Sequence, residues 1–349
     1  MVLDQTDHEL VEIFQDPATG LRGVVALHST TLGPAMGGLR IAAYDDIESM
    51  VADTLRLSRA MTMKNAAAGL PLGGGKAVLF DDGRWHLLRR ERLVAFGRIL
   101  DRLGGSYIAA EDSGTTAQDM EVIATVSDWV AGRPAEFGGR GDPAPYTACT
   151  VLAAIEAAAR LHLGHQSMAG VRVGILGAGA VGSQLAQLLT EIEADVVVAD
   201  IVADRALAVS ASTGAAIMAP GSLLADGLDV LSPCSLGGVI DAVTATNLRC
   251  SIVAGAANNP LADEALASDM HESGILYVPD FIANCGGIIH VGAEALGLTP
   301  AESDELIASA NRRSAELLAS AAERGVSPLV LALELAEKQL SASRAPEAS

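Results

Sequence analysis

The segment Val171-Arg172-Val173-Gly174-Ile175-Leu176-Gly177-Ala178-Gly179-Ala180-Val181-Gly182 decides the fold of the second half of the chain. An apolar stretch typical of a buried strand enters the spacing G-x-G-x-x-G, and a helical pattern follows at residues 183–192. A second apolar strand, at residues 195–199, ends in Asp200. The glycine spacing alone is weak evidence, but the order strand, turn, helix, strand and acid predicts a Rossmann unit that binds a dinucleotide.

Each part of this fingerprint has a role on a dinucleotide. Gly177 makes the turn, Gly179 lets the pyrophosphate approach the helix N-terminus, and Gly182 lets helix and strand pack closely. Asp200 accepts a hydrogen bond from a ribose 2′-hydroxyl and repels a 2′-phosphate, so we expect NAD, with Arg205 as the nearby cation that would soften this preference. Other fingerprint positions expected to contact the cofactor are Ala178, Ala180, Val181 and Ile201.

A second informative segment, residues 60–78, carries Lys64 and Lys76 among small and apolar residues, with three glycines directly before Lys76. Burial and a neighbouring cation both disfavour the charged ammonium group, and a buried lysine can lose ~3–5 pKa units and become a base. The glycines allow a positive φ and a close approach of substrate to the backbone. The alternative is that both lysines are solvated, one ending a helix and one following a glycine turn.

Composition limits the classes of function. The chain has 349 residues, enough for two domains, and no uncharged apolar run reaches the ~18 residues of a membrane span. Its formal net charge of −20 disfavours nucleic acid and anionic lipid as partners. The start of the chain lacks the features of a secretory signal, so we expect a cytoplasmic protein. Neither a disulfide framework nor a metal site is expected from the cysteine and histidine spacings; the cysteines are Cys149, Cys234, Cys250 and Cys285.

The first part of the chain alternates strand and helix patterns, which predicts an α/β domain. Residues 33–40 contain Gly37-Gly38 before Arg40 and are expected to form a turn, either a plain one or one that presents backbone N–H groups to an anion. A strand ending just before Asp112 would place this carboxylate where α/β folds bind ligands, although helix capping is the simpler role. The other expected elements are a hairpin (10–14 and 21–28), a helix from Asp46 that carries Lys64, a strand (77–80), a helix (85–103) and a strand (107–110).

The second part begins after residues 131–146, a stretch rich in glycine and proline that is typical of a linker or an active-site loop. A helix at 148–163 and strands at 229–231, 251–254 and 276–278 are expected, with the strand ends lining the cofactor site. Two tail helices, 301–324 and 327–340, are expected to pack on the first domain. We therefore expect a domain at residues 1–145, joined by a C-terminal helix at about 325–349, and a dinucleotide-binding domain at 146–324.

With these segments placed, the chain resembles the amino-acid dehydrogenase family that includes leucine, valine, phenylalanine and glutamate dehydrogenases, and is most similar to the branched-chain members. The matching segments are residues 33–40, 61–78, 110–116, the Rossmann fingerprint and 255–259, in that order. The resemblance implies an N-terminal α/β domain for substrate binding and oligomerisation, a Rossmann domain, and a deep cleft between them. It also implies a homo-oligomer, since family members form dimers to octamers.

The resemblance implies roles for individual residues. Lys76 would be the catalytic lysine, Asp112 would handle the amino group, and Lys64 would hold the substrate carboxylate. Asn258 would bridge the substrate and the nicotinamide ribose. Further cofactor-contacting positions by this similarity are Arg40, Ser113, Thr147, Ser235, Leu236 and Ala257. Departures from the family pattern occur at Leu39, Ser113, Cys149 and Cys285, and none removes a group that carries chemistry.

The implied reaction is oxidative deamination with NAD. A hydride leaves Cα of the amino acid for the nicotinamide, and water adds to the resulting imine. Neutral Lys76 is suited to take a proton from that water, and Asp112 can move protons to and from the departing nitrogen, with no metal required. Two competing functions are a dinucleotide-binding regulator, which has no need of the two lysines, and an inactive homologue.

The substrate side chain is predicted from a few positions. Glutamate members carry a lysine just before the glycine pair, where this chain has Met36, so a second substrate carboxylate would stay unpaired and glutamate should be rejected. Branched Ile288 and Val291 would shorten the pocket and favour valine, leucine or isoleucine. Flexible Met36 could instead admit an aromatic ring, as in phenylalanine dehydrogenases, and these residues could also be ordinary core. Gly38 and Ala110 complete the expected substrate site.

Overall fold

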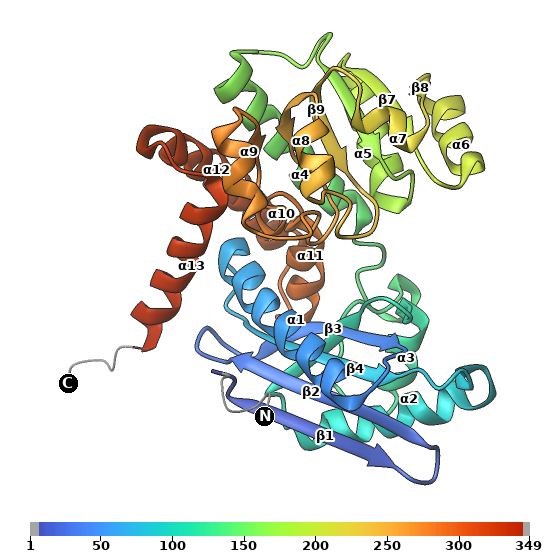
Figure 1. Ribbon diagram of the computed structural model, residues 1–349. Helices are drawn as coiled ribbons and strands as arrows, with labels where there is room; N and C mark the ends of the chain where they lie inside the picture. Colours follow the sequence, from blue (N-terminus) through green and yellow to red (C-terminus); the bar gives the residue numbers. More distant parts are fainter. Residues whose placement is uncertain (1–6, 345–349) are drawn as a thin grey trace. The chain divides into compact units, whose positions relative to one another are not determined.

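The computed structural model describes residues 7–344, which form two compact units (Figure 1). Unit 1 comprises the chain up to Pro143, then Ile288–Ser303 and the segment from Ala336 onward. Unit 2 comprises Ala144–Gly287 and Asp304–Leu335. The sequence placed residues 288–303 in the dinucleotide-binding half, whereas they belong to unit 1. This difference matters for the site, because Ile288 and Val291 share unit 1 with Lys76.

Unit 1 is built on a five-stranded sheet of order β1-β2-β4-β3-β5. The expected hairpin forms as antiparallel β1 and β2, and β2 pairs with β4 in the same sense. β3 lies between β4 and β5 and is parallel to both. The strands are β1 (Leu10–Asp16), β2 (Leu21–Ser29), β3 (Ala35–Ala42), β4 (Gly73–Phe80) and β5 (Tyr107–Glu111).

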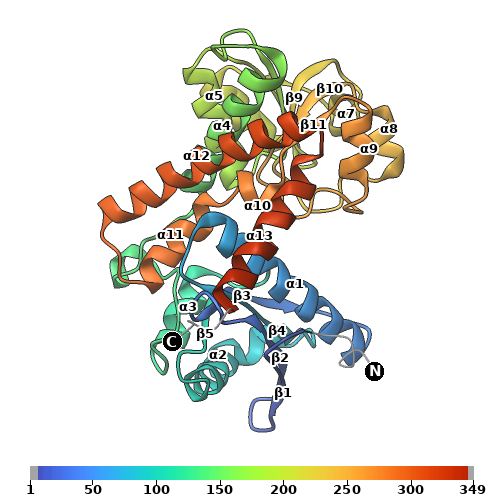
Figure 2. The ribbon, with the colours of Figure 1, turned by 90° about the vertical axis from the view of Figure 1, so that its left-hand side faces the viewer.

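Helices cover both faces of this sheet (Figure 2). α1 (Ile47–Ala68) begins at the predicted N-cap Asp46, whose side chain accepts from the Ser49 amide, and packs on Val24, Ala26 and Val78. α2 (Trp85–Arg102) and α3 (Ala117–Ala124) lie with the opposite face, where Phe96 and Met120 share a core with Leu39. The central strands are therefore buried on both faces, as parallel strands usually are.

The expected turn at residues 33–40 and the alternative of a glycine turn before Lys76 are both wrong. Residues 33–40 are not a turn, because they enter the central strand β3, and Gly73–Gly75 open β4 instead of forming a turn before Lys76. None of the glycines of β3 or β4 has a positive φ. They are needed for close packing: a Cβ on Gly74 would lie 2.1 Å from the Thr62 amide nitrogen of α1, and one on Gly37 would lie 1.9 Å from the Gly75 carbonyl oxygen.

Unit 2 confirms the Rossmann prediction. Its six strands are parallel in the order β11-β10-β9-β6-β7-β8, with apolar cores on both faces. The strands are β6 (Arg172–Leu176), β7 (Asp195–Ala199), β8 (Ala216–Ile217), β9 (Leu228–Pro233), β10 (Cys250–Val253) and β11 (Leu276–Tyr277). The helices are α4 (Ala144–Ala158), which continues into a π-turn at Ala159–Leu163, α5 (Ala180–Glu191), α6 (Ala203–Thr213), α7 (Pro220–Leu224), α8 (Ala242–Asn247), α9 (Leu266–Glu272) and α10 (Asp280–Ala283).

The last helices divide between the units. α11 (Gly286–Ala295) begins in unit 2 and continues in unit 1, and α12 (Pro300–Arg324) lies mostly in unit 2, where Leu318 joins the core. Only the end of α13 (Pro328–Arg344) belongs to unit 1, where Ala336 and Leu340 pack on Met63 of α1. The expectation that both tail helices pack on the first domain is therefore correct for the end of α13 alone.

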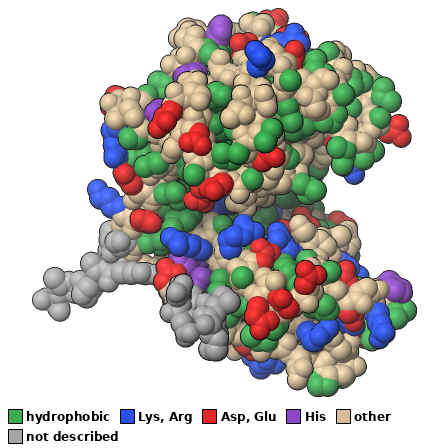
Figure 3. Space-filling view, in the orientation of Figure 1, with side chains coloured by type: hydrophobic (Ala, Val, Ile, Leu, Met, Phe, Trp, Pro, Cys, Tyr) green, Lys and Arg blue, Asp and Glu red, His purple; other side chains and the backbone are tan. Residues whose placement is uncertain are grey.

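The surface is mixed in charge. On the face shown in Figure 3, acidic and basic side chains are interspersed among apolar and neutral ones. No helix within residues 7–344 is long and apolar enough to cross a membrane. Among the same described residues, no group of three or more His, Cys, Asp and Glu side chains is arranged to hold a metal ion.

Candidate functional site

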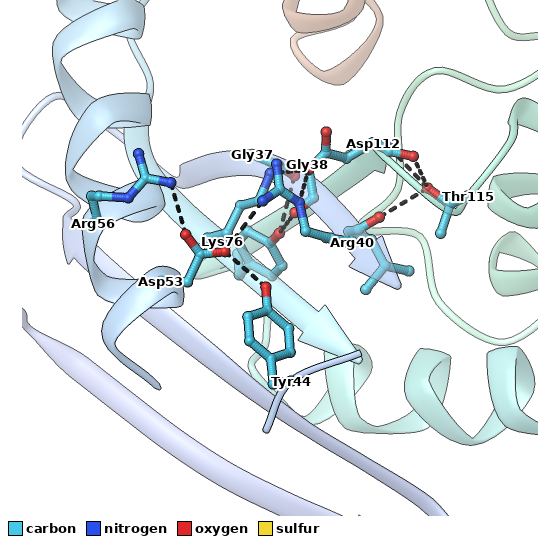
Figure 4. A network of polar contacts seen from close by, with 11 residues as sticks. Gly37, Gly38, Arg40, Tyr44, Asp53, Arg56, Lys76, Asp112 and Thr115 are labelled. Carbon is cyan, nitrogen blue, oxygen red and sulfur yellow. Dashed lines mark hydrogen bonds and ion pairs between the residues drawn. The ribbon is translucent and has the colours of Figure 1, made fainter. Parts of the chain in front are cut away.

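The sheet of unit 1 brings Lys76 and Asp112 together. Lys76 lies within β4 and Asp112 follows β5, and the intervening β3 pairs with both strands. Lys76 Nζ donates a hydrogen bond to Asp112 Oδ2 (Figure 4). Gly38 of β3 permits this contact, because a Cβ there would lie 2.6 Å from the Asp112 Cβ and 3.0 Å from Lys76 Nζ. The absent side chain of Gly38 thus creates the space in which the pair meets.

The electrostatics of this pair suit proton transfer. The Lys76 side chain is 5% exposed, and burial lowers the pKa of its ammonium group although the Asp112 carboxylate opposes this shift. Burial acts to raise the pKa of Asp112, but Lys76 and Arg40 together hold it below its usual range. The result is an ionised carboxylate beside a lysine that loses its proton more readily than a solvated one. The alternative of a solvated lysine after a glycine turn is therefore wrong for Lys76.

Strand alternation explains which other residues share this site. On β3, Leu39 points into the core on the α2 side, so the alternate positions Met36, Gly38 and Arg40 face the α1 side together with Lys76. Ala110 of β5 pairs with Gly38 and lies on this same face. Leu39, the position that departs from the family pattern, is fully buried and does not reach the site.

The predicted substrate residues of unit 1 differ in exposure. Met36 is fully buried, Ala110 and Val291 are nearly so, and Lys64 and Ile288 are half-buried. The Met36 carbonyl oxygen accepts from Asn65 Nδ2 at 3.4 Å. An apolar side chain thus occupies the position before the glycine pair, as the substrate prediction requires.

A further network of unit 1 had no signal in the sequence. Arg40 Nε donates to Asp112 Oδ2 at 3.2 Å, and Arg40 Nη1 donates to Asp53 Oδ2, also at 3.2 Å. Tyr44 Oη and Arg56 Nη2 donate to Asp53 as well, each at 2.7 Å (Figure 4). The spacing of Asp53 and Arg56 on a helix indicates only a surface ion pair. No sequence pattern could connect Asp53 to Asp112.

Thr115 is a second residue that sequence reasoning missed. Its hydroxyl accepts from the Asp112 amide at 2.9 Å and donates to the Leu39 carbonyl oxygen at 2.8 Å. These bonds tie the turn after β5 to β3 and hold the backbone of Asp112. A threonine three residues after an aspartate at a strand end is a local turn signal that could have suggested this role.

The glycine fingerprint of unit 2 has the local geometry expected of it. Gly177 has φ +115°, and its amide donates to the Ala199 carbonyl oxygen at 2.7 Å. A Cβ on Gly182 would lie 1.9 Å from the Gly177 carbonyl oxygen, so only glycine lets α5 pack this closely. Gly179 is the N-cap of α5, and a Cβ there would meet nothing within 4 Å. The helix N-terminus is therefore open to a ligand at Gly179.

Asp200 closes this turn. Its Oδ2 accepts from the Ala178 amide and its Oδ1 from the Val202 amide, each at 2.7 Å. Burial acts to raise the pKa of Asp200, but the two backbone N–H groups hold it below its usual value. Each carboxylate oxygen keeps lone-pair capacity for a hydroxyl donor. The adjacent residue Ile201 is 89% exposed.

The remaining predicted cofactor residues fall in both units. Arg40 and Ser113 belong to unit 1, and Ala180 and Val181 lie in the first turn of α5 in unit 2. Ser235 Oγ is buried and has no hydrogen-bond partner within the described residues, which is a donor and acceptor left for a ligand. Also in unit 2 are Thr147 (half-buried), Leu236 (exposed), Ala257 (buried) and Asn258 (exposed).

Asn284 was expected only as part of a strand end that lines the cofactor site, and it holds a predicted residue. It is 2% exposed, and its Nδ2 donates to Asn258 Oδ1 and to the Ala256 carbonyl oxygen, each at 3.1 Å. Its position in Asn284-Cys285-Gly286-Gly287, at the end of a βα unit, was the available signal. Of the two departing cysteines, Cys285 is buried and Cys149 is exposed, and neither forms a disulfide within the described residues.

Comparison with known proteins agrees with this geometry. Residues 8–128 match the model of the Glu/Leu/Phe/Val dehydrogenase dimerisation domain, and residues 199–332 match that of the Glutamate/Leucine/Phenylalanine/Valine dehydrogenase domain. The chain is 40% identical over 347 residues to valine dehydrogenase of Streptomyces virginiae, covering 98% of this chain and 96% of the relative. It is 36% identical over 342 residues to leucine dehydrogenase of Bacillus subtilis (strain 168), covering 98% and 94%.

Solved structures have the same fold. L-tryptophan dehydrogenase from Nostoc punctiforme is similar with a TM-score of 0.85 and 34% identity, covering 98% of each chain. The hetero-hexameric glutamate dehydrogenase from Thermus thermophilus gives a TM-score of 0.79 at 24% identity, covering 96% of this chain and 89% of the other, which supports the fold alone. The resemblance inferred from the motifs is thereby confirmed: the chain belongs to the Glu/Leu/Phe/Val dehydrogenase family.

Proposed function

We propose that this chain is an NAD-dependent dehydrogenase that oxidatively deaminates an aliphatic branched-chain L-amino acid to its 2-oxo acid and ammonia. The observation that carries the proposal is the buried Lys76–Asp112 pair, in a chain 36–40% identical to valine and leucine dehydrogenases over nearly its full length. The family consists of amino-acid dehydrogenases with a dinucleotide-binding domain, so a nicotinamide cofactor follows from membership.

The roles of Lys76 and Asp112 follow from their charges and contact. When bound, the nicotinamide ring supplies the acceptor for the hydride that leaves the substrate Cα. Neutral Lys76 accepts at Nζ a proton from the water that adds to the substrate imine, and its lowered pKa increases the neutral fraction at working pH. Asp112, ionised and in contact with Nζ, holds the amine in place and moves protons to and from the departing nitrogen.

Residues around this pair support an aliphatic substrate. The buried Met36 offers no charge to a second substrate carboxylate, and burying that carboxylate unpaired costs several kcal/mol, so glutamate is rejected. Ala110, Ile288 and Val291 belong to the same unit and would line a short apolar pocket. Lys64 would hold the substrate α-carboxylate, and Asn258, oriented by Asn284, would contact substrate and nicotinamide ribose.

The chain's residues fit NAD. Asp200 lies at the end of β7 with lone pairs available to a ribose hydroxyl, Gly179 leaves open space at the α5 N-terminus, and Ser235 Oγ lacks a partner. We therefore place the adenosine ribose at Asp200 and the pyrophosphate at Gly179.

NAD should be preferred over NADP. A 2′-phosphate beside the Asp200 carboxylate would meet ~1–4 kcal/mol of repulsion at 4 Å, which corresponds to roughly a 10- to 1000-fold lower kcat/KM. Asp200→Ser should narrow this ratio, mainly by improving use of NADP. Equal kcat/KM for both cofactors in the wild-type chain would show that Asp200 does not face the ribose.

An aromatic substrate is the second candidate. It is favoured by the flexibility of Met36 and by the similarity to L-tryptophan dehydrogenase.

The match to a dimerisation domain supports an oligomer, and we propose a homo-oligomer. The four cysteines form no disulfide within the described residues, which supports the proposed cytoplasmic location, where thiols stay reduced.

The direct test of the proposed activity is to mix the purified chain with NAD and L-valine or L-leucine. NADH should form, and ammonia should be released in equal amount. The 2-oxo acid, ammonia and NADH should drive the reverse reaction. A chain that binds NADH but forms none with any L-amino acid would instead be a dinucleotide-binding regulator or an inactive homologue.

A further inference from the structure

One carboxylate oxygen of unit 1 is shared by two cations. Both Lys76 Nζ and Arg40 Nε donate to Oδ2 of Asp112 (Figure 4). The Arg40 and Asp112 side chains are only 23% and 24% exposed, so solvent screens this contact little. Arg40 therefore competes with Lys76 for the anion that would otherwise stabilise the lysine in its charged form.

Arg40 is held in this position from its other side. Its Nη1 donates to Asp53 Oδ2 on α1, and the same oxygen accepts from Tyr44 Oη at 2.7 Å. Burial raises the pKa of Tyr44 to about 12, so its hydroxyl keeps its proton and remains a donor through the assay range. The guanidinium group thus binds two carboxylates from different elements through two separate nitrogens, whereas a lysine has only one.

The charged and titratable groups around Lys76 come from every element packed on it. Asp112 and Asp53 favour the ammonium form, and Arg40 disfavours it. Tyr107 of β5 is buried and neutral, since burial raises its pKa far above the usual value, and its hydroxyl donates to the carbonyl oxygens of Gly37 and Gly38. Of these groups, Arg40 is the cation that shares the Asp112 carboxylate with Lys76, so its removal should change the protonation of the lysine.

We propose that Arg40 is a positioning residue of the acid–base pair: anchored by Asp53, it shares Oδ2 of Asp112 with Lys76 and so favours the neutral lysine. This inference rests on the proposed function. It differs from the cofactor contact that family resemblance implies for Arg40, because both arms of the guanidinium group named here bind carboxylates of unit 1.

The two roles of Arg40 predict different kinetics for Arg40→Gln. If Arg40 is a positioning residue, its loss should raise the pKa of Lys76. The rising limb of the plot of kcat/KM against pH should then move by about one unit to higher pH. At pH values below this limb, kcat/KM should fall ~10-fold, while the KM for NAD stays unchanged. A raised KM for NAD with an unmoved limb would overturn the proposal and make Arg40 a cofactor contact.

Asp53→Ala tests the anchor while leaving Arg40, Lys76 and Asp112 in place. Loss of the anchor should release Arg40 and move the limb to higher pH, in the same direction as Arg40→Gln. A move to lower pH would show that Asp53 acts only as a negative charge near Lys76 and would overturn the anchoring role. The matched control is Arg133→Gln, which breaks an Nε-to-carboxylate pair with Glu121 of similar exposure and should leave the limb in place.

A readout independent of turnover separates this inference from the proposed function. The chain contains three lysines, Lys64, Lys76 and Lys338, so their acetylation by acetic anhydride can be followed peptide by peptide as pH changes. The Lys76 profile should move to higher pH in Arg40→Gln and Asp53→Ala, with Lys338 as the internal standard. An unchanged Lys76 profile overturns the inference, whereas an inactive wild-type chain with a shifted profile overturns only the proposed function. Thermal melts establish whether each variant folds. If Arg40→Gln does not fold, the test rests on Asp53→Ala.

Discussion

Lys76→Ala is expected to lower kcat by ~10²–10⁴ or more while NADH still binds to the chain. The lysine is the buried amine that contacts Asp112, and no other lysine lies in the described part of β3, β4 or β5. Its removal takes away the group proposed to accept the proton from water. The rising limb of the pH profile should disappear along with the rate. Steady-state kinetics and NADH titration by fluorescence measure both effects.

Lys338→Ala is the matched control, since this lysine is exposed on α13. It should retain wild-type kcat and the same pH profile. A Lys76→Ala variant that keeps a tenth of wild-type kcat would contradict the assignment of Lys76 as the base.

Gly182→Ala is expected to destabilise unit 2 and to weaken NADH binding sharply. The added methyl group would lie 1.9 Å from the Gly177 carbonyl oxygen, so α5 or the turn must move. Such overpacking typically costs ~1–3 kcal/mol, and here it displaces the helix N-terminus proposed to face the pyrophosphate. Thermal melting and NADH titration should both show the loss.

Gly179→Ala provides the contrast within the same fingerprint. Its Cβ would meet no protein atom within 4 Å, so the melting temperature should stay at the wild-type value. NADH affinity should still fall, because the methyl group fills the space through which a pyrophosphate approaches. Wild-type stability and affinity in Gly182→Ala would contradict the packing role, and wild-type affinity in Gly179→Ala would contradict the proposed placement of the pyrophosphate.

The Rossmann half could be predicted because its signal is local. An apolar strand, the glycines of the turn and Asp200 occupy one continuous stretch, and β7 has the predicted bounds, Asp195–Ala199. Each of these glycines is required for a separate geometric reason. Gly177 has a positive φ, and Gly182 packs too closely on the turn to carry a side chain. Local consistency of this kind is what sequence patterns report best.

The glycine-rich strands of unit 1 could not be predicted in the same way. β3 and β4 contain Gly37, Gly38 and Gly73–Gly75, and glycine runs are ordinarily typical of turns. Their strand conformation is imposed by tertiary packing, since α1 and the neighbouring strand lie too close for a side chain. Missing β3 also hid the alternation that sets Met36, Gly38 and Arg40 on one face with Lys76.

Lys76 and Asp112 were both predicted as site residues, but the contacts around them were not. Each of the two had a local signal: Lys76 lies among apolar residues, and Asp112 follows the end of a strand. Asp53 and Tyr44 had none, because their contacts join residues distant in sequence or look like an ordinary helix pair, and Thr115 had only a turn signal. Positioning residues of this kind become visible only once the register of the sheet is known.

The central claim is tested most directly by kcat/KM with NAD for L-valine, L-leucine, L-isoleucine, L-phenylalanine and L-glutamate under one condition. The three aliphatic substrates should lead and differ among themselves modestly, since one methylene in an apolar pocket contributes ~1–3 kcal/mol. Glutamate should be the poorest, because Met36 leaves its second carboxylate unpaired. A clear lead for phenylalanine would contradict the short pocket of Ile288 and Val291, and a lead for glutamate would contradict the account of the substrate site as a whole.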